Sequence, residues 1–301
     1  MQLEAEYPVL ITHPEKLLWP EAKVSKVQYI QYMIRMAPWL LPHLKDRPLT
    51  LIRFPNGIHG HSFYQKNRPQ GTPEWMTTVP IWSTDRNDVI HYILADSVAA
   101  LIWLANMACL EFHVGFTTVD RPEEPKAVAF DLDPTIKGFE PVREVALAIH
   151  GLLTRLGLSH VAKTSGATGL QVFVPLAPGH TYAQTRLFTK AVADYLLHTL
   201  PNVVTLERLT KNRGRKVYVD YLQHGPTRTL IAPYSPRATV HATVSCPLSW
   251  RELEAGAVPE QFTVNNVPER VEQIGDLMNC GPAANLRAIA SFLSANPGRS
   301  L

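Results

Sequence analysis

Two aspartates, Asp131 and Asp133, close a run of apolar residues in the segment AVAFDLDP. Side chains on a strand alternate between its faces, so the two carboxylates are expected to project on the same side. Like charges this close raise each other's pKa unless a cation lies between them, and hard divalent ions bind such oxygen ligands. This spacing indicates a metal site. The alternative is structural: Asp133 begins a turn before Pro134, and Asp131 caps a neighbouring segment.

A second candidate is the segment KTSGATGLQVFVP, residues 163–175, which predicts a tight hairpin of strand, small-residue turn and strand. Gly166 and Gly169 would let backbone N–H groups approach an anion closely, and Ser165 adds a hydroxyl. The segment matches neither the GxxxxGK[ST] phosphate loop nor the GxGxxG dinucleotide motif. Phosphate binding and an ordinary hairpin turn are both open readings of it.

A basic run leads into the apolar segment VYVDYLQ. Asp220 is predicted in the middle of that strand, where an unpaired carboxylate would be costly. If Asp220 met Asp131 and Asp133 across a sheet, the carboxylates would complete a two-metal site. Arg228 and Arg237 downstream are candidates for holding the phosphates of a triphosphate. The structural alternative for the basic run is a solvated loop. Its cations are Arg208, Lys211, Arg213, Arg215 and Lys216.

The elements that must position these residues follow from periodicity and capping signals. Helices are predicted at 25–37 with Ser25 as N-cap, and at 97–110, 141–156 and 182–200, and Pro38 is expected to end or kink the first of them. Strands are predicted at 49–54, 62–65, 89–94, 111–116, 127–132, 160–163, 170–176, 203–206, 216–222 and 228–232, and short helices near 250–255, 268–277 and 284–293. This interleaving predicts an α/β (α+β) fold. The polar segment RPEEPK, residues 121–126, is a candidate sub-domain seam.

Length and composition exclude several classes of protein. The chain has 301 residues, 46% of them hydrophobic and 18% charged, which excludes disorder over most of its length. A net charge of +3 does not by itself indicate nucleic acid. The cysteines at 109, 246 and 280 form neither a disulfide framework nor a CxxC zinc site, which favours a reducing, cytoplasmic compartment. No signal peptide is visible, and the apolar stretch 98–110 is shorter than the roughly 20 residues of a membrane span, so no membrane partner is expected.

Taken in order, the motifs DLDP, TSGxxGLxVxVPL and VDYxQ…IAPYSxR resemble the polymerase domain of bacterial DNA ligase D, a member of the archaeo-eukaryotic primase superfamily. The resemblance runs from Thr12 to the C-terminal helices, and the ordered set is more specific than any one motif. It implies a primase-polymerase fold: mixed sheets flanked by helices, with two closely packed sub-domains in one domain, 1–301. It also implies a nucleotidyltransferase of non-homologous end joining that favours ribonucleotides and uses two divalent ions, Mn²⁺ or Mg²⁺.

The resemblance assigns an active site. The family's carboxylate triad maps onto Asp131, Asp133 and Asp220, as catalytic residues and metal ligands. Gly169 and Arg228 enter the nucleotide-binding set from their own chemistry, and the family's motifs supply the others. That set is Arg53 in RFPNG, His113 in LEFHV, Ser165, Gly169, Gln223, Arg228 and Arg237.

The resemblance also assigns contacts with DNA. A pocket for the 5′-phosphate of the downstream strand is implied at His13, Lys16 and Lys26. The two lysines flank the predicted helix start at Ser25, where the helix dipole and free N–H groups would favour an anion. The alternative is that both are ordinary surface lysines. Template and DNA contacts are implied for Phe63, Tyr64, Lys66, Arg213 and Arg215.

The sequence departs from the family pattern at three positions. Thr168 replaces a lysine, Gln171 replaces a histidine, and Ile52 stands where a lysine precedes the arginine. Two outcomes are open: nucleotide affinity is lower than in the family, or Lys163 and Arg228 substitute for the missing phosphate contacts. No KxDG-type adenylation motif is present, so we expect a stand-alone polymerase or one excised domain.

The predicted function is therefore template-dependent addition of nucleotides to a 3′-hydroxyl at gaps and broken DNA ends. The implied partners are DNA with gaps or double-strand-break ends, nucleoside triphosphates, Ku and a DNA ligase, in the cytoplasm at the bacterial nucleoid. One alternative is a non-catalytic module that binds DNA ends, although all the acids of the triad are present. The other is a metal-dependent phosphodiesterase, which has no evident use for the triphosphate-binding arginines.

Overall fold

The chain folds into two compact units. The computed structural model describes residues 2–3 and 7–296. The first unit comprises Met1–Asp120, Thr229–Ser245 and Glu260–Gly275, and the second comprises Arg121–Arg228, Cys246–Pro259 and Asp276–Leu301. The chain first passes between them at the start of the polar segment 121–126. Each unit combines a mixed or antiparallel sheet with helices, so the predicted α/β (α+β) class is confirmed.

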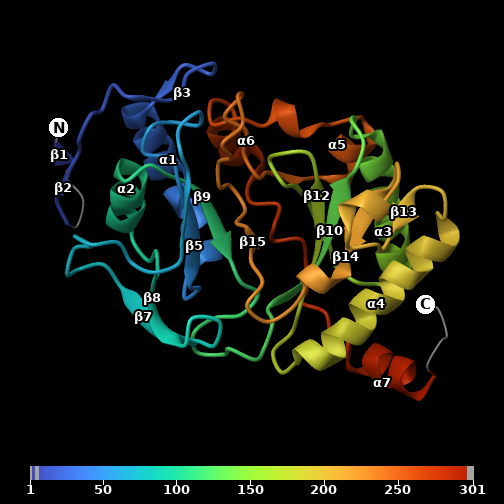
Figure 1. Cartoon of the computed structure of the whole chain (residues 1–301). Coiled ribbons are helices and arrows are strands. Elements are labelled where there is room, and N and C mark those ends of the chain that lie inside the picture. Colours follow the sequence, from blue (N-terminus) through green and yellow to red (C-terminus); the bar gives the residue numbers. More distant parts are fainter. Residues whose placement is uncertain (1, 4–6, 297–301) are drawn as a thin grey trace. The chain divides into compact units, whose positions relative to one another are not determined.

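The first unit is built on an antiparallel four-stranded sheet in the order β15-β9-β5-β6. Helices α1 and α2 pack against each other beside this sheet (Figure 1). The central elements are β5 (Leu49–Arg53), β6 (Phe63–Gln65), β9 (Cys109–Val114), β15 (Leu230–Ile231), α1 (Lys26–Leu44) and α2 (Val98–Asn106). Smaller elements complete the unit: β1 (Gln2–Leu3), β2 (Val9–Leu10), β3 (Leu17–Trp19), β4 (Val24–Ser25), β7 (Thr78–Ser83), β8 (Asp88–Ile93), η3 (Pro259–Gln261, which begins in the second unit) and α6 (Val267–Ile274).

Helix α1 begins where the sequence predicts and ends later. Ser25 and Gln28 form a reciprocal capping box at its start. Of the two expectations for Pro38, an end or a kink, the end is wrong: α1 continues to Leu44 with Pro38 and Pro42 inside it. Each turn beyond the proline still buries an apolar side chain, since Leu40 and Leu44 are both 0% exposed. Burial therefore outweighs the backbone hydrogen bond that a proline removes.

The second unit is built on a six-stranded sheet in the order β13-β14-β10-β12-β11-β16. All its neighbouring strands are antiparallel except the pair β13–β14. The strands are β10 (Ala127–Pro134), β11 (Val161–Thr164), β12 (Leu170–Pro175), β13 (Val204–Thr205), β14 (Val217–Asp220) and β16 (Pro247–Leu248). The helices are α3 (Glu140–Arg155), α4 (Tyr182–Thr199), α5 (Trp250–Glu254) and α7 (Arg287–Ala295), with short 3₁₀ turns η1 (Thr210–Asn212) and η2 (Tyr221–Gln223).

The central strand β10 has two chemically different faces. Phe130 and Leu132 are 0% exposed, and the Phe130 ring meets Phe188 of α4 with centroids 6.2 Å apart. Asp131 and Asp133 alternate with these residues and so lie on the other face, where both are half-buried. The helix-covered face thus anchors the strand, and the opposite face presents its acids.

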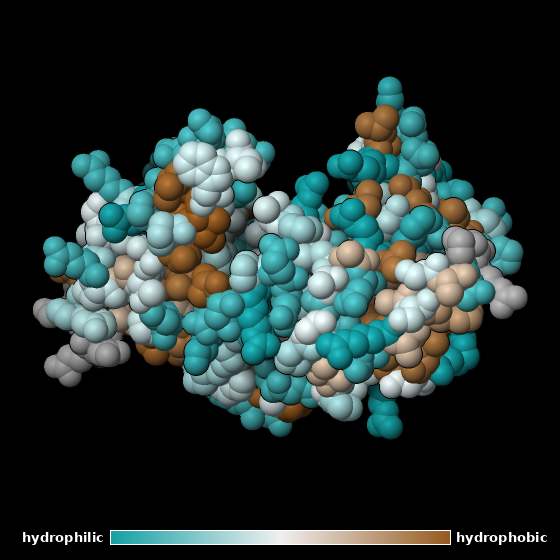
Figure 2. Space-filling view, turned by 90° about the horizontal axis from the view of Figure 1, so that it is seen from below, coloured by the Kyte–Doolittle hydropathy of each residue, from teal (hydrophilic) through white to brown (hydrophobic). Residues whose placement is uncertain are grey.

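On the face shown in Figure 2, brown patches lie among teal and white side chains, and the brown side chains on the left adjoin one another in a band. Across the residues that the structure describes, no helix has both the length and the apolar character needed to span a membrane.

Candidate active site

The sheet of the second unit places the three predicted acids on one face. Asp131 of β10 is the register partner of Asp220 of β14, and Asp133 is the partner of Tyr218. Directly opposed residues, and residues two apart on one strand, share a face of the sheet. The expectation that Asp220 lies in mid-strand is wrong, because Asp220 is the last residue of β14 and its Oδ1 accepts the N–H of Gln223, 3.0 Å away, at the turn η2.

Burial and neighbouring charges raise the pKa of the Asp131 carboxyl. Burial raises the pKa of Asp131 to about 7, and the charge of Asp133 adds to this rise. Asp220 contributes in the same direction, whereas a hydrogen bond from Gln171 lowers the pKa. Burial and the neighbouring Asp220 likewise raise the pKa of Tyr218 to about 12. A cation bound at this face would therefore reduce the repulsion among the carboxylates of Asp131, Asp133 and Asp220.

The acids share this face without forming a closed ligand cluster. In residues 2–3 and 7–296, no group of three or more His, Cys, Asp or Glu side chains is gathered closely enough to hold a metal ion. The carboxylate oxygens have the hard donor chemistry that divalent ions such as Mg²⁺ and Mn²⁺ bind.

A row of polar side chains continues from Asp131 across the sheet. Gln171 of β12 is the register partner of both Asp131 and Lys163. Its Nε2 donates to Asp131 Oδ1 at 3.1 Å, and its Oε1 accepts from Lys163 Nζ at 2.6 Å. The expectation that Lys163 substitutes as a phosphate contact is wrong, because this side chain is 0% exposed and points along the sheet to Gln171.

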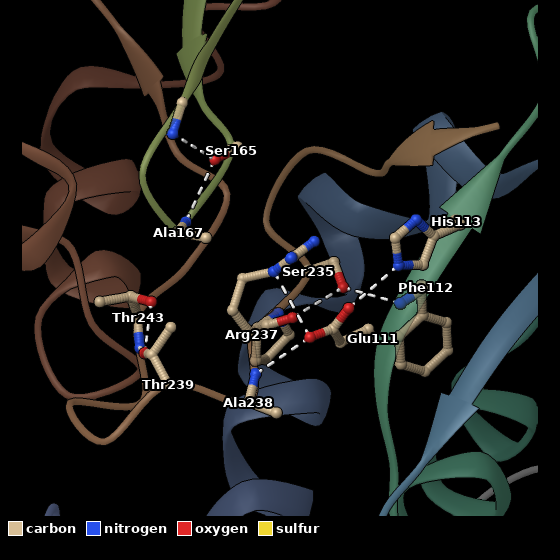
Figure 3. A network of polar contacts seen from close by, with 12 residues as sticks. Glu111, Phe112, His113, Ser165, Ala167, Ser235, Arg237, Ala238, Thr239 and Thr243 are labelled. Atoms are coloured by element: carbon tan, nitrogen blue, oxygen red, sulfur yellow. Dashed lines mark hydrogen bonds and ion pairs between the residues drawn. The ribbon is translucent and has the colours of Figure 1, made fainter. Parts of the chain in front are cut away.

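The predicted hairpin is formed by β11 and β12, and its turn is organised by Ser165. The Ser165 hydroxyl accepts the N–H groups of Ala167 at 3.2 Å, as Figure 3 shows, and of Gly169 at 3.1 Å. The Gly169 N–H is thus bound within the loop. Gly169 is needed for a different reason: a Cβ there would stand 2.6 Å from the carbonyl oxygen of Leu132. Glycine lets this loop lie directly against β10 beside Asp133, whose Oδ1 would be 3.4 Å from that Cβ.

The first unit joins two of the predicted nucleotide-binding residues through a third that the sequence analysis missed. Glu111 Oε2 lies 3.1 Å from His113 Nε2, and Glu111 Oε1 lies 3.4 Å from Arg237 Nε and accepts the Ala238 N–H at 3.1 Å (Figure 3). Glu111 is only 5% exposed. Burial raises its pKa, but the bond to His113 and the charge of Arg237 outweigh burial and lower it overall.

A signal for Glu111 is present in the sequence. The segment LEFHV alternates apolar and polar residues, so Glu111 and His113 share one face of β9. An acid between two buried apolar residues needs a partner, because a buried charge is costly unless it is paired or binds a metal.

The remaining nucleotide-binding candidates are Arg53, Arg228 and Gln223, and only Gln223 contacts one of the three acids. Arg53 donates to the carbonyl oxygen of Met107 and to Gln65 Oε1, both at 3.1 Å. Arg228 is exposed, and Gln223 meets Asp220 through its backbone N–H. Loop and strand contacts thus group Ser165, Gly169 and Gln223 near the acids of the second unit, and Glu111 groups His113 with Arg237 in the first.

The basic loop between β13 and β14 is partly structural. The Arg213 guanidinium lies 3.8 Å from the centre of the Tyr218 ring and donates to the carbonyl oxygens of Glu207 and Arg208 at 3.0 and 2.9 Å. Lys216 Nζ donates to the carbonyl oxygen of Pro201. Arg215 is exposed. Arg213 therefore fixes the loop against Tyr218, the residue that faces Asp133.

The predicted phosphate pocket is built differently from expectation. The N–H groups that open α1 are occupied: those of Lys26 and Val27 donate to the carbonyl oxygens of Lys16 and Pro14 at 2.8 and 2.9 Å. The expectation of free helix N–H groups is therefore wrong. Lys16 Nζ donates to Asn56 Oδ1 at 2.9 Å, and Lys26 Nζ donates to the carbonyl oxygen of Thr12 at 2.7 Å. Burial first, and the charge of Lys16 second, lower the pKa of Lys26. His13 is exposed on the preceding loop.

The predicted template contacts are accessible. Phe63 is 49% and Tyr64 is 63% exposed on β6, and as successive strand residues they face opposite sides. Lys66 Nζ lies 5.9 Å from the centre of the Tyr64 ring. Exposed aromatic faces of this kind are suited to stacking on unpaired bases.

Comparison with known proteins adds a family match to this geometry. Residues 25–278 match the family model described as LigD, primase-polymerase domain. The chain is 37% identical over 88% of its length to the bifunctional non-homologous end joining protein LigD of Bacillus subtilis, and it covers 42% of that protein. It is 32% identical over 90% of its length to the multifunctional LigD of Mycolicibacterium smegmatis, covering 35% of it. The chain thus spans less than half the length of these relatives.

A solved structure shares the fold. The polymerase domain of Mycobacterium tuberculosis ligase D, in complex with DNA, superposes with a TM-score of 0.83 at 30% sequence identity. The match covers 94% of this chain and 98% of that domain. The expected primase-polymerase architecture of mixed sheets flanked by helices is confirmed by this likeness.

Proposed function

Because the chain belongs to the LigD primase-polymerase family, a family of primase-polymerase-type nucleotidyltransferases, we propose that it is the polymerase domain of DNA end joining. It adds nucleotides to a 3′-hydroxyl at gaps and broken ends, directed by the opposing strand. Residues 1–301 act as one functional domain built from the two units. Ribonucleotides are incorporated at least as well as deoxyribonucleotides, an expectation that rests on the family.

The observation that carries this proposal is the shared face of Asp131, Asp133 and Asp220. These carboxylates would hold two divalent ions, Mn²⁺ or Mg²⁺. Bound there, such ions supply a lowered pKa for the primer hydroxyl and neutralise charge on the triphosphate and the leaving pyrophosphate. The protein's own part is to hold three acids at fixed register on a rigid sheet, which keeps the reacting groups in line.

Other residues bind the nucleotide and the DNA in this proposal. The network of Glu111 positions His113 and Arg237 toward the incoming nucleotide. The remaining proposed nucleotide contacts are Arg53, Ser165, Gly169, Gln223 and Arg228, and the proposed template and DNA contacts are Phe63, Tyr64, Lys66, Arg213 and Arg215.

The N-terminal cations are proposed to recognise the end of the broken DNA strand. Lys16 and Lys26, with His13, would bind the 5′-phosphate of the downstream strand. What supports this is that Lys26 is only 6% exposed and that its pKa is lowered first by burial and then by the charge of Lys16, so a bound anion would stabilise its charged form. We propose Ku and a DNA ligase as partners at the nucleoid.

Incubation of the protein with a labelled gapped duplex, nucleoside triphosphates and Mn²⁺ tests this function. Templated extension of the primer supports the polymerase. Binding without extension would support a non-catalytic end-binding module, and shortening of the strand would support a phosphodiesterase. Competition between a ribonucleotide and its deoxyribonucleotide on one templating base tests the sugar preference, which a strong bias toward the deoxyribonucleotide would contradict.

A further inference from the structure

A buried lysine in the second unit stands at one end of a polar row that ends on Asp131. Lys163 is 0% exposed, which makes it the most deeply buried charged side chain in the part of the chain that the structure describes. Its Nζ lies 2.6 Å from Gln171 Oε1, 3.5 Å from the carbonyl oxygen of Thr164 and 5.6 Å from the centre of the Phe173 ring. Burying a cation is costly unless partners compensate it, so a sheet that needed only packing here would be better served by an apolar residue.

The chemistry of the row fixes the direction of the amide in its middle. An ammonium group only donates hydrogen bonds, so Lys163 requires the oxygen of Gln171 on its side. The amide nitrogen must then face β10, where it donates to Asp131 Oδ1 at 3.1 Å. Gln171 is 3% exposed, and water therefore has little access to replace either bond.

The hydrogen bonds from Lys163 through Gln171 to Asp131 hold the Asp131 carboxylate against repulsion from the neighbouring acids. Asp133 and Asp220 repel the Asp131 carboxylate, which without support would turn away from them. The bond from Gln171 fixes Oδ1, and this sets the direction of the second carboxylate oxygen as well. The row follows the register of the sheet: Lys163 of β11 pairs with Gln171 of β12, which pairs with Asp131 of β10. Asp131 in turn pairs with Asp220 of β14, so the support lies in the plane of one rigid sheet.

We infer that Lys163 and Gln171 are positioning residues, a relay that orients the Asp131 carboxylate for the divalent ion. This inference rests on the proposed function, because it requires a metal ion at Asp131. It accounts for the glutamine at position 171, since an amide carries one acceptor and one donor on opposite sides. A neutral imidazole carries the same pair, which makes histidine the conservative replacement.

The relay is tested with Mn²⁺ as the probe. The constants to measure are Mn²⁺ affinity by calorimetry without nucleotide, the Mn²⁺ concentration for half-maximal primer extension, and the nucleotide KM at saturating Mn²⁺. In Gln171→Leu the affinity for Mn²⁺ should fall by about tenfold or more, and the Mn²⁺ concentration for half-maximal extension should rise by the same factor. Losses of this size are typical when a group supporting a metal ligand is removed. The nucleotide KM should stay within about threefold, because the loss concerns the metal ligand alone.

Three further variants separate orientation from general damage. Gln171→His should restore both metal constants to within about threefold of wild type, because it keeps the donor and the acceptor. Lys163→Met should reproduce the defect of Gln171→Leu although residue 163 does not touch Asp131, and the double variant should be little worse than either single one. Gln184→Leu breaks the capping box of α4 in the same unit and is the control for lost stability.

The outcomes are distinct. Unchanged metal constants in folded Gln171→Leu and Lys163→Met would overturn the relay, as would a defect in Gln184→Leu equal to theirs. If Gln171→Leu does not fold, Gln171→Asn decides, because its shorter side chain cannot span both partners: wild-type metal constants there would also overturn the relay. Absence of Mn²⁺ binding and extension in the wild type would instead refute the proposed function.

Discussion

Asp131 and Asp220 stand directly opposite each other on adjacent antiparallel strands of the second unit. Like charges in opposed positions destabilise a sheet. The protein keeps this arrangement at the centre of its largest sheet, with Asp133 two residues further along the same face. Stability given up in a cluster of like charges is the usual mark of a functional site.

Asp131→Asn should therefore make the metal-free protein more stable while abolishing nucleotide addition. The amide removes the repulsion from Asp133 and Asp220, and its oxygen can still accept from Gln171. We expect a gain of about 1 kcal/mol, which corresponds to a rise of roughly 2–4 °C in melting temperature. Thermal unfolding in a chelating buffer at pH 8 measures it. The exposed Asp194→Asn is the control and should give no gain, and a lowered melting temperature for Asp131→Asn would contradict the prediction.

Glu111→Gln should weaken nucleotide binding from within the first unit. The substitution keeps the size of the side chain and an acceptor for the Ala238 N–H, but it removes the charge that pairs with Arg237 and His113. A bond to a charged group contributes about 1.5–3 kcal/mol, so the KM for the nucleotide should rise about tenfold or more. Steady-state extension gives this constant. Glu272→Gln, which loses an exposed pair with Arg35, should leave it unchanged, and equal effects in the two variants would refute the assignment.

Replacing both Lys16 and Lys26 by Met should remove the preference for a 5′-phosphorylated gap. Methionine keeps the buried apolar stem of Lys26 while the charge is lost. The wild type should bind gapped DNA about tenfold more tightly with the phosphate than without it, as expected for one charged contact. Binding titrations at fixed salt compare the two duplexes. Lys45→Met, at the other end of α1, should keep the preference, and a wild type that binds both duplexes equally would show that the pocket is absent.

Acid should destabilise the second unit through His224. This side chain is 1% exposed, and burial lowers its pKa from 6.5 to about 4, with the charge of Arg186 acting in the same direction. In the unfolded chain His224 is therefore protonated as the pH falls below about 6.5, whereas in the folded chain it is protonated only near pH 4. Stability is fully present above pH 6.5 and is lost as pH falls toward 4, by up to about 3 kcal/mol.

Denaturant unfolding of wild type and His224→Gln at pH 7 and pH 4.5 isolates this contribution. The variant lacks the titrating group, so its stability should fall less between the two pH values. The same fall in both proteins would assign acid sensitivity to other groups.

Much of the acid face could be predicted from the sequence because strand alternation is a local property. The pairs Asp131 and Asp133, and Glu111 and His113, each follow from residues two apart on one strand. The partnership of Asp131 with Asp220 is not local: it depends on the register between β10 and β14, which lie far apart in the sequence. The motif order suggested it, and only the pairing of strands defines it.

The errors have physical causes of the same kind. Lys163 has the composition of a phosphate ligand, but the register of β11 against β12 turns it toward Gln171 in the sheet interior. The start of α1 looks like an anion site, yet the loop at Pro14 and Lys16 folds back and occupies its N–H groups. In both cases a contact between distant segments decides the role of a residue whose local pattern is ambiguous.

The most direct test of the central claim is single-turnover primer extension with Asp220→Ala, measured together with DNA affinity. If Asp131, Asp133 and Asp220 form the catalytic centre, the rate of nucleotide addition should fall by at least about a thousandfold, while the affinity for a gapped duplex stays within about threefold of wild type. Extension by Asp220→Ala at the wild-type rate would contradict the claim.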